Sequence, residues 1–140
     1  MGGSSGCSGP NPNHMGSLLT WNFQLPVHGG ERTTVFLVEK YDVRLDKLTE
    51  YAALLKKFDA FAKKRPDLFK GVKSHRVFRH MLGGSYGGCI EMTEMDSLAD
   101  VEKFVAKAMA DKEFMTKIYA EFMALIVTET YSANIWTPTA

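Results

Sequence analysis

The sequence predicts an α+β fold with the element order strand, helix, strand, strand, helix, strand. Three observations support this order. Four segments distribute apolar residues as β-strands do, two longer segments repeat them at helical spacing, and a glycine-rich stretch separates the two middle strands. The resulting βαββαβ order is typical of a ferredoxin-like fold, in which one antiparallel sheet carries two helices on one face.

The first strand and the first helix have clear patterns. Residues 33–43, TTVFLVEKYDV, are β-branched and aromatic with both alternating phases apolar, which predicts a central strand covered on both faces. From Leu45 to about Lys64 the apolar residues recur at helical spacing, and Pro66 disfavours helix in the residue before it. We therefore expect an amphipathic helix after the first strand.

The glycine-rich stretch HMLGGSYGGCIEM, residues 80–92, could in principle hold a phosphate. A phosphate loop leads directly into a helix, usually with a Lys-Ser or Lys-Thr pair. Here no lysine follows the glycines, and the next residues, CIEMTEM, alternate as a strand does. The stretch is therefore interpreted as the turn of a β-hairpin.

Charge pairing predicts the register of this hairpin. With residues 83–87 as the connection, Arg79 opposes Glu91 and Arg76 opposes Glu94, and each pair is modestly favourable across strands. We expect one set of side chains to point towards the helices and another towards the open face of the sheet. The first set is Phe78, Leu82, Ile90 and Met92, and the second is His75, Val77, Arg79, Cys89, Glu91 and Thr93.

The second helix begins after Ser97, a favourable N-cap residue, with Asp100 in its first turn. Phe114 departs from the apolar stripe of this helix, so we expect a break there, with Asp111 capping a second segment. The final strand is predicted over residues 127–138. One sheet with helices on a single face leaves its other face in need of a cover.

Composition divides the chain into three parts. Residues 1–17 consist mainly of Gly, Ser, Pro and Asn and read as an expression tag, and residues 18–32 as an N-terminal extension that could dock on the sheet. Residues 33–138 are the predicted domain. Cys7 lies in the tag, so Cys89 stands alone and can form neither an internal disulfide nor a multi-thiolate zinc site.

Charge and hydropathy exclude several classes of function. The chain has 17 Lys and Arg against 16 Asp and Glu, so its net charge of +1 does not favour nucleic acid as a partner. No apolar run is long enough to span a membrane, and no leader is recognisable, so we expect a cytoplasmic protein. His75 and His80 would lie on opposite faces of one strand, which argues against a shared metal.

The segment PDLFKGVKSHRVFRHMLGGSYGGCIEMTEMDSLADVEKFVAKAMADKEFMTKI resembles the dimeric α/β-barrel superfamily. That superfamily includes antibiotic-biosynthesis-monooxygenase-like, EthD-like (ethyl-tert-butyl-ether-degradation-like) and muconolactone-isomerase-like proteins. The likeness lies in the hairpin, in the start of the second helix at SLADVEKF and in the break at DKEF. It implies a homodimer in which two open sheets pack face to face. Lys107 stands about where the haem-degrading branch carries its axial His, so we expect no haem or other cofactor.

The resemblance implies a small-molecule enzyme, a cofactor-independent oxygenase or isomerase that takes a proton from an apolar or aromatic acid or phenol. The alternative is a non-catalytic ligand-binding or stress-related module with the same pocket. Each site residue also has a purely structural interpretation, such as a solvent-facing His or a cross-strand ion pair. A second location, between the sheet and the second helix near Met123, stays open. The candidate catalytic residues are His75 and Glu91, and the candidate substrate-binding residues are Arg79, Trp136, Tyr41, Phe104 and Tyr119.

Overall fold

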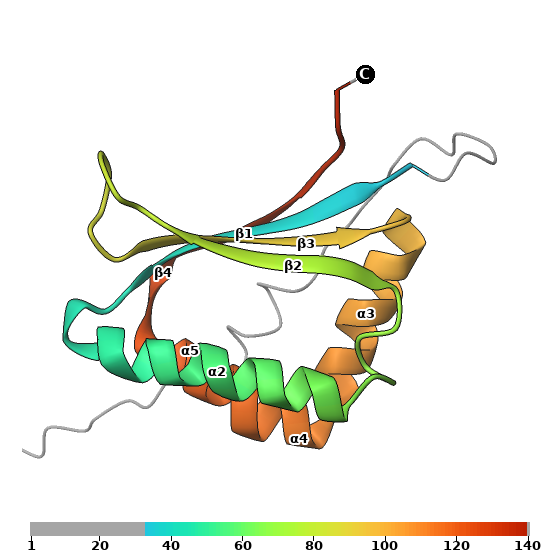
Figure 1. Ribbon diagram of the computed structural model, residues 1–140, viewed down its shortest axis with the longest axis horizontal. Helices are drawn as coiled ribbons and strands as arrows, with labels where there is room; N and C mark the ends of the chain where they lie inside the picture. The colour runs from blue at the N-terminus through green and yellow to red at the C-terminus, as the bar shows by residue number, and fades with distance from the viewer. Residues whose placement is uncertain (1–32, 140) are drawn as a thin grey trace, which may run out of the picture. The chain divides into compact units, whose positions relative to one another are not determined.

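The computed structural model describes residues 33–139, and the predicted tag (1–17) and N-terminal extension (18–32) lie outside them. The elements follow the predicted order (Figure 1). They are β1 (Val35–Val43), the short 3₁₀ turn η1 (Leu45–Lys47), α2 (Leu48–Lys64), β2 (Val72–Arg79), β3 (Gly88–Met95), α3 (Leu98–Ala110), α4 (Lys112–Phe114), the π-helical turn η2 (Met115–Tyr119), α5 (Ala120–Leu125) and β4 (Ile126–Trp136).

The four strands form one antiparallel sheet in the order β2-β3-β1-β4. The predicted α+β, ferredoxin-like architecture is therefore confirmed, and β1 lies inside the sheet as its apolar composition indicated. All the helices of the described chain lie on one face of the sheet, with α2 beside α5 (Figure 1). This arrangement gives the sheet a face that the helices cover and an open face.

The predicted register of the β2–β3 hairpin is wrong by two residues. Arg79 pairs with Cys89, and Val77 stands opposite Glu91. The connection is longer than expected, because the His80 amide donates to the Gly88 carbonyl at 2.9 Å and so closes the ladder two positions earlier. The two opposite-charge pairs used to set the register therefore do not form across these strands.

The predicted faces of the hairpin are also reversed. Cys89 and Thr93 are 4% exposed and lie on the side that the helices cover, whereas Phe78 is 48% exposed on the other side. A shift of two residues leaves side chains on their original face, so this error is independent of the register error. Its cause is Glu91, a charged residue that would be expected outside but is hydrogen-bonded inside.

The helix boundaries follow the predicted capping residues. The Ser97 hydroxyl accepts a hydrogen bond from the Asp100 amide at 3.2 Å, and Asp111 accepts one from the Phe114 amide at 2.8 Å. Asp111 also pairs with Arg65, which follows α2, at 2.6 Å. The break between α3 and α4 is therefore both capped and tied to the end of α2.

After this break the helix widens into the π-helical turn η2 before α5 begins. Ile118 of η2 is buried and Tyr119 is half-buried, while Phe114 just before the turn packs on Phe61. Single π-turns of this kind occur frequently at functional sites. The core that it joins consists of Tyr41, Val43, Tyr51, Leu54, Phe61, Leu68, Cys89, Ile118, Leu125 and Ile126.

Candidate functional site

A group of hydrogen-bonded polar side chains lies between the centre of the sheet and the helices. Its members come from β1, α2, β2, β3 and β4, and we call it the Glu91 cluster. It is made up of Glu39, Tyr41, Tyr51, His75, Glu91 and Tyr131.

Glu91 is the centre of the cluster. Its Oε1 accepts a hydrogen bond from the Tyr41 hydroxyl, and its Oε2 lies 3.1 Å from His75 Nε2. The side chains of Glu91 and His75 are only 16% and 22% exposed. In this setting, a charged carboxylate is stabilised by its two partners rather than by water.

The Tyr41 hydroxyl also links the sheet to the helical layer. Its oxygen lies 2.6 Å from that of Tyr51 in α2, so Glu91, Tyr41 and Tyr51 form a continuous chain of hydrogen bonds. Burial is the main reason that the pKa values of both tyrosines are raised. These two hydroxyls therefore stay protonated and act as hydrogen-bond donors.

Glu39 is the second carboxyl of the cluster. It stands directly opposite Glu91 on the neighbouring strand, and its Oε1 accepts a hydrogen bond of 2.5 Å from the Tyr131 hydroxyl. Burial, followed by the charge of Glu91, raises the pKa of Glu39 to about 7, although Tyr131 and His75 act in the opposite direction. Two carboxyls this close to each other resist being ionised at the same time, because their negative charges repel.

His75 is influenced by opposing effects. Burial by itself would lower its pKa, but the hydrogen bond to Glu91 and the charges of Glu91 and Glu39 raise the pKa overall. If Nε2 donates to Glu91, the neutral ring carries its lone pair on Nδ1. The pair then has the arrangement of a general base held in place by a carboxylate.

A bulge in β4 positions Tyr131. The β1–β4 ladder shifts between Lys40 and Asp42, and the Asp42 amide donates to the Thr130 hydroxyl at 2.8 Å instead of to a carbonyl of β4. The next residue, Tyr131, then reaches Glu39 on the helix-covered side. Bulges are frequent beside active sites, where they redirect a side chain.

Aromatic rings surround the polar groups. Phe122 contacts the ring of Tyr41 edge-on at 4.8 Å, and Phe58 lies 5.2 Å from the imidazole of His75. Phe69 links Phe58 to Phe104, with ring centroids 5.5 Å and 5.7 Å apart. A few polar groups within aromatic surroundings are the usual composition of a small-molecule site.

The structure brings some of the predicted site residues together. His75, Glu91 and Tyr41 are in direct contact. Tyr119 lies near enough for the charge of Glu39 to help raise its pKa, after the larger effect of burial. Phe104 connects to His75 only through Phe69 and Phe58.

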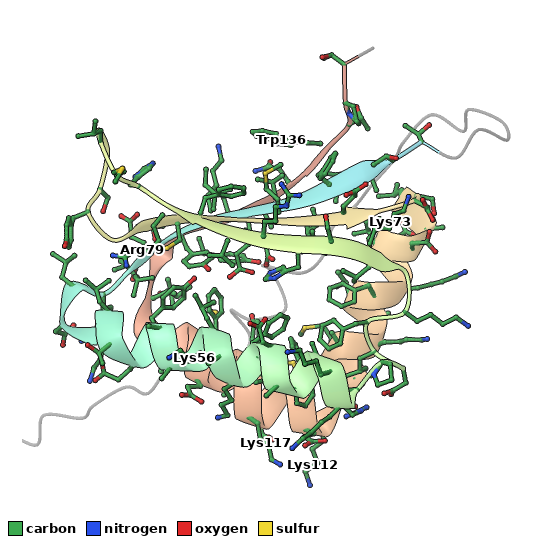
Figure 2. All side chains as sticks on the ribbon, viewed as in Figure 1. Lys56, Lys73, Arg79, Lys112, Lys117 and Trp136 are labelled. Atoms are coloured by element: carbon green, nitrogen blue, oxygen red, sulfur yellow. The ribbon has the colours of Figure 1, made fainter. Side chains whose placement is uncertain are left out.

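Two predicted residues lie elsewhere. Trp136 is on the open face of the sheet, 47% exposed and 5.2 Å from Lys40 Nζ (Figure 2). Arg79 is exposed at the end of β2 opposite Cys89, so it does not oppose Glu91 as predicted. Trp136 therefore lies on the open face, whereas His75 and Glu91 lie on the face that the helices cover.

Sequence reasoning did not single out Glu39, Tyr51 or Tyr131. Glu39 carried a usable signal, because it is an acidic residue in the middle of a strand predicted to be covered on both faces. In the sequence, Tyr51 is simply one of the residues that recur at helical spacing in the first helix. Tyr131 depends on the β4 bulge, for which the local sequence offers no clear pattern.

The cluster can accept or donate protons, but its residues do not resemble a metal centre. Within residues 33–139, no three His, Cys, Asp or Glu side chains come together in a way that could hold a metal ion. In the same part of the chain, none of the helices has the length and apolar character needed to cross a membrane. The carboxyl, imidazole and hydroxyl groups of the Glu91 cluster offer acid–base chemistry and hydrogen bonding.

Comparison with solved structures shows the same fold in other proteins. A NIPSNAP family protein from Agrobacterium tumefaciens matches with a TM-score of 0.61 and 22% identity, over 81% of this chain and 92% of that one. A NIPSNAP-like domain protein from Burkholderia xenovorans matches with a TM-score of 0.60 and 18% identity, over 79% and 89%. SnoaB, a cofactor-independent oxygenase from Streptomyces nogalater, matches with a TM-score of 0.56 and 15% identity, over 77% and 95%.

These similarities show that the chain shares its fold with these proteins, as the predicted resemblance implies. No family model matches the sequence, and the comparison with curated proteins gave no match. Fold alone does not determine an activity, so the function has to be argued from the Glu91 cluster.

Proposed function

We propose that this chain is a small-molecule enzyme that removes a proton from an apolar or aromatic acid or phenol, leading to oxygenation or isomerisation without a cofactor. The observation that supports the proposal most directly is the contact of 3.1 Å between His75 Nε2 and Glu91 Oε2, largely shielded from water. The similarity in fold to SnoaB, a cofactor-independent oxygenase, is consistent with it.

In the proposed reaction His75 is the base and Glu91 orients it. The O–H or C–H bond of the substrate breaks, its proton moves to the imidazole, and the substrate becomes an anion. Glu91 stabilises the resulting imidazolium, and the Tyr41 hydroxyl fixes the carboxylate. In an isomerisation the proton returns to another atom of the substrate. In an oxygenation a carbon of the anion bonds to dioxygen, the peroxide formed takes the proton back from His75, and loss of water with cleavage of the O–O bond leaves a carbonyl group.

The second candidate is a non-catalytic binding module that uses the same residues. One observation favours it: both oxygens of Glu91 already have partners within the chain, Tyr41 on one and His75 on the other. Such a satisfied pair could serve mainly to keep the sheet and helices together. The two candidates differ in whether a bound molecule is consumed or only held.

We further propose that the protein is a homodimer formed through the open face of the sheet. Phe78 and Trp136 are 48% and 47% exposed on this face, and the half-buried Ile90 and Met92 lie on the same side. Large apolar side chains gathered on one face are typical of a protein–protein interface. Under this proposal, Trp136 belongs to the interface rather than to the substrate site. A cytoplasmic location stays a prediction.

Native mass spectrometry of the purified protein tests the proposed activity by identifying any small molecule that co-purifies. That molecule, or 2-naphthol if none is retained, is then incubated with the protein in air and followed by mass spectrometry and NMR. We expect conversion, slowed at least tenfold by Glu91→Gln and by His75→Asn. Glu102→Gln, at an exposed position on α3, is the control and should convert the molecule like the parent. Binding without conversion would support the second candidate.

A further inference from the structure

The two carboxyls of the Glu91 cluster differ in how they are satisfied. Among the described residues, both oxygens of Glu91 have hydrogen-bond partners, whereas Glu39 has one only on Oε1, which accepts from Tyr131. Oε2 of Glu39 is therefore the carboxyl oxygen that a ligand could approach. Glu39 also lies close to the π-helical turn, since its charge acts on Tyr119.

The charges around Glu39 come from several elements. Glu91 of β3 is its direct neighbour, and His75 of β2, when protonated, is the positive charge that lowers the pKa of Glu39. Asp59 of α2 adds a further negative charge that acts on His75. The other titratable groups of the cluster are hydroxyls, namely those of Tyr41, Tyr51, Tyr119 and Tyr131.

The basic side chains nearest to Glu39 along these strands, Arg79 and Lys40, are not among the groups whose charges shift its pKa. Arg79, a predicted substrate-binding residue, stands opposite Cys89 at the end of β2, and its charge acts on Cys89. Lys40, the neighbour of Glu39 in β1, lies on the open face over the ring of Trp136. A ligand carboxylate placed beside Glu39 would thus meet two carboxyls and a single imidazole. Like charges at short distance repel strongly where water is scarce.

We infer that Glu39 is a specificity-determining residue of the proposed site, and that it selects a ligand whose polar group is a neutral hydroxyl, as in a phenol, over a ligand that carries a carboxylate. The hydroxyl of such a ligand can donate a hydrogen bond to Oε2 of Glu39 without adding charge. This inference rests on the proposed function, because it assigns the ligand class of the same site. It favours the phenols among the acids and phenols considered above.

The test uses 2-naphthol and 2-naphthoate, which share one aromatic ring system and differ in the polar group. Binding of each probe to the full chain is measured by NMR titration at pH 6 and pH 8, where naphthol is neutral and naphthoate is ionised. We expect the parent protein to bind naphthol at least tenfold more tightly than naphthoate at pH 8. Lowering the pH to 6 should tighten naphthoate binding severalfold, as Glu39 takes up a proton.

Glu39→Gln removes the charge but keeps an oxygen that can accept from Tyr131. This substitution should strengthen naphthoate binding at pH 8 and make that binding depend less on pH. The pH dependence that remains would come from His75. The exposed Glu102→Gln on α3 is the matched control and should preserve the preference for naphthol. A preference that is equal in the parent and in Glu39→Gln would overturn the inference.

The outcomes separate the inference from the function on which it rests. If naphthoate binds the parent as tightly as naphthol at pH 8, and Glu91→Gln still abolishes conversion of naphthol, only the assignment of Glu39 is wrong. If neither probe shows saturable binding at either pH, both the inference and the proposed site are overturned. Saturable binding of naphthol that Glu39→Gln and Glu91→Gln leave unchanged would place the ligand outside the cluster and also overturn both.

Discussion

Glu39 and Glu91 stand directly opposite each other on β1 and β3, both on the side of the sheet that the helices cover. Like charges opposite each other on paired strands ordinarily destabilise a sheet. Here the chain surrounds them with tyrosine hydroxyls and one imidazole, and the consequences can be measured in stability as well as in binding.

The first prediction concerns pH and stability. The pKa of Glu39 is raised by burial from 4.5 to about 7, so between these values the folded chain keeps a proton that the unfolded chain releases. The free energy of unfolding should therefore fall as the pH rises, by about 1 to 3 kcal/mol between pH 5 and pH 8. His75, whose pKa is also raised, contributes stability below about 6.5 that is lost as the pH rises further, in the same direction.

Urea unfolding at several pH values checks this, with Glu39→Gln as the test variant and Glu102→Gln as the control. Glu39→Gln should show a shallower fall, because only His75 then contributes. A parent protein that becomes more stable from pH 5 to pH 8 would contradict the assignment.

The second prediction concerns the hydroxyl that joins the sheet to α2. Tyr41→Phe removes the bond to Glu91 and the bond to Tyr51 together, leaving a half-buried carboxylate with one partner fewer. We expect a loss of about 1 to 3 kcal/mol in the free energy of unfolding. Tyr86→Phe, at an exposed position in the hairpin loop, should change it by less than about 0.5 kcal/mol. Equal effects of the two substitutions would show that the Tyr41 hydroxyl has no structural importance.

The third prediction concerns the open face. Sedimentation at micromolar concentration should show two chains per particle for the parent protein. Trp136→Glu or Phe78→Glu should produce monomers, because a charge would be buried in the proposed interface. Leu45→Glu, 64% exposed in η1, should leave the dimer intact. A folded parent protein that sediments as a monomer would rule out the interface.

The fourth prediction compares two glycines of the hairpin. A Cβ on Gly87 would lie 2.2 Å from the backbone oxygen of Val43, so Gly87→Ala must displace the end of β1 and should cost about 3 kcal/mol or more. Gly83 has a φ of +72°, but a Cβ added there would meet nothing within 4 Å, so Gly83→Ala should cost only about 1 to 2 kcal/mol. Thermal unfolding of both variants tests the order, and a milder effect at Gly87 would contradict the close approach.

The sequence was sufficient for the order and the type of the elements. The β-branched and aromatic composition of β1, with both phases apolar, indicated a central strand. Ser97 and Asp111 marked helix starts because capping depends on residues only three positions apart. The fold class followed from that order. Such features are local, so a single sequence carries them.

The site depended on contacts that are not local. Both faces of the β2–β3 hairpin carry apolar residues, so alternation alone could not decide which face is buried. Glu91 was placed outside because it is charged, but its partners Tyr41 and His75 come from two other strands. His75 and Glu91 were correctly grouped on one face, although the face was wrong. Pairing between strands, not composition, makes that position suitable for a carboxylate.

The π-helical turn η2 has a consequence for the way in which insertions and deletions would act on this chain. A π-turn contains one residue more than an α-turn, and one residue corresponds to about 100° of rotation in an α-helix. Phe114 before the turn packs on Phe61, and Tyr119 at its end lies near Glu39. Loss of one residue from the turn would restore a regular helix but rotate one of these rings out of place. The extra residue thus allows Phe114 to pack on Phe61 while Tyr119 lies near Glu39. A homologue that lacks this residue could keep the fold but lose Tyr119 from its position near Glu39.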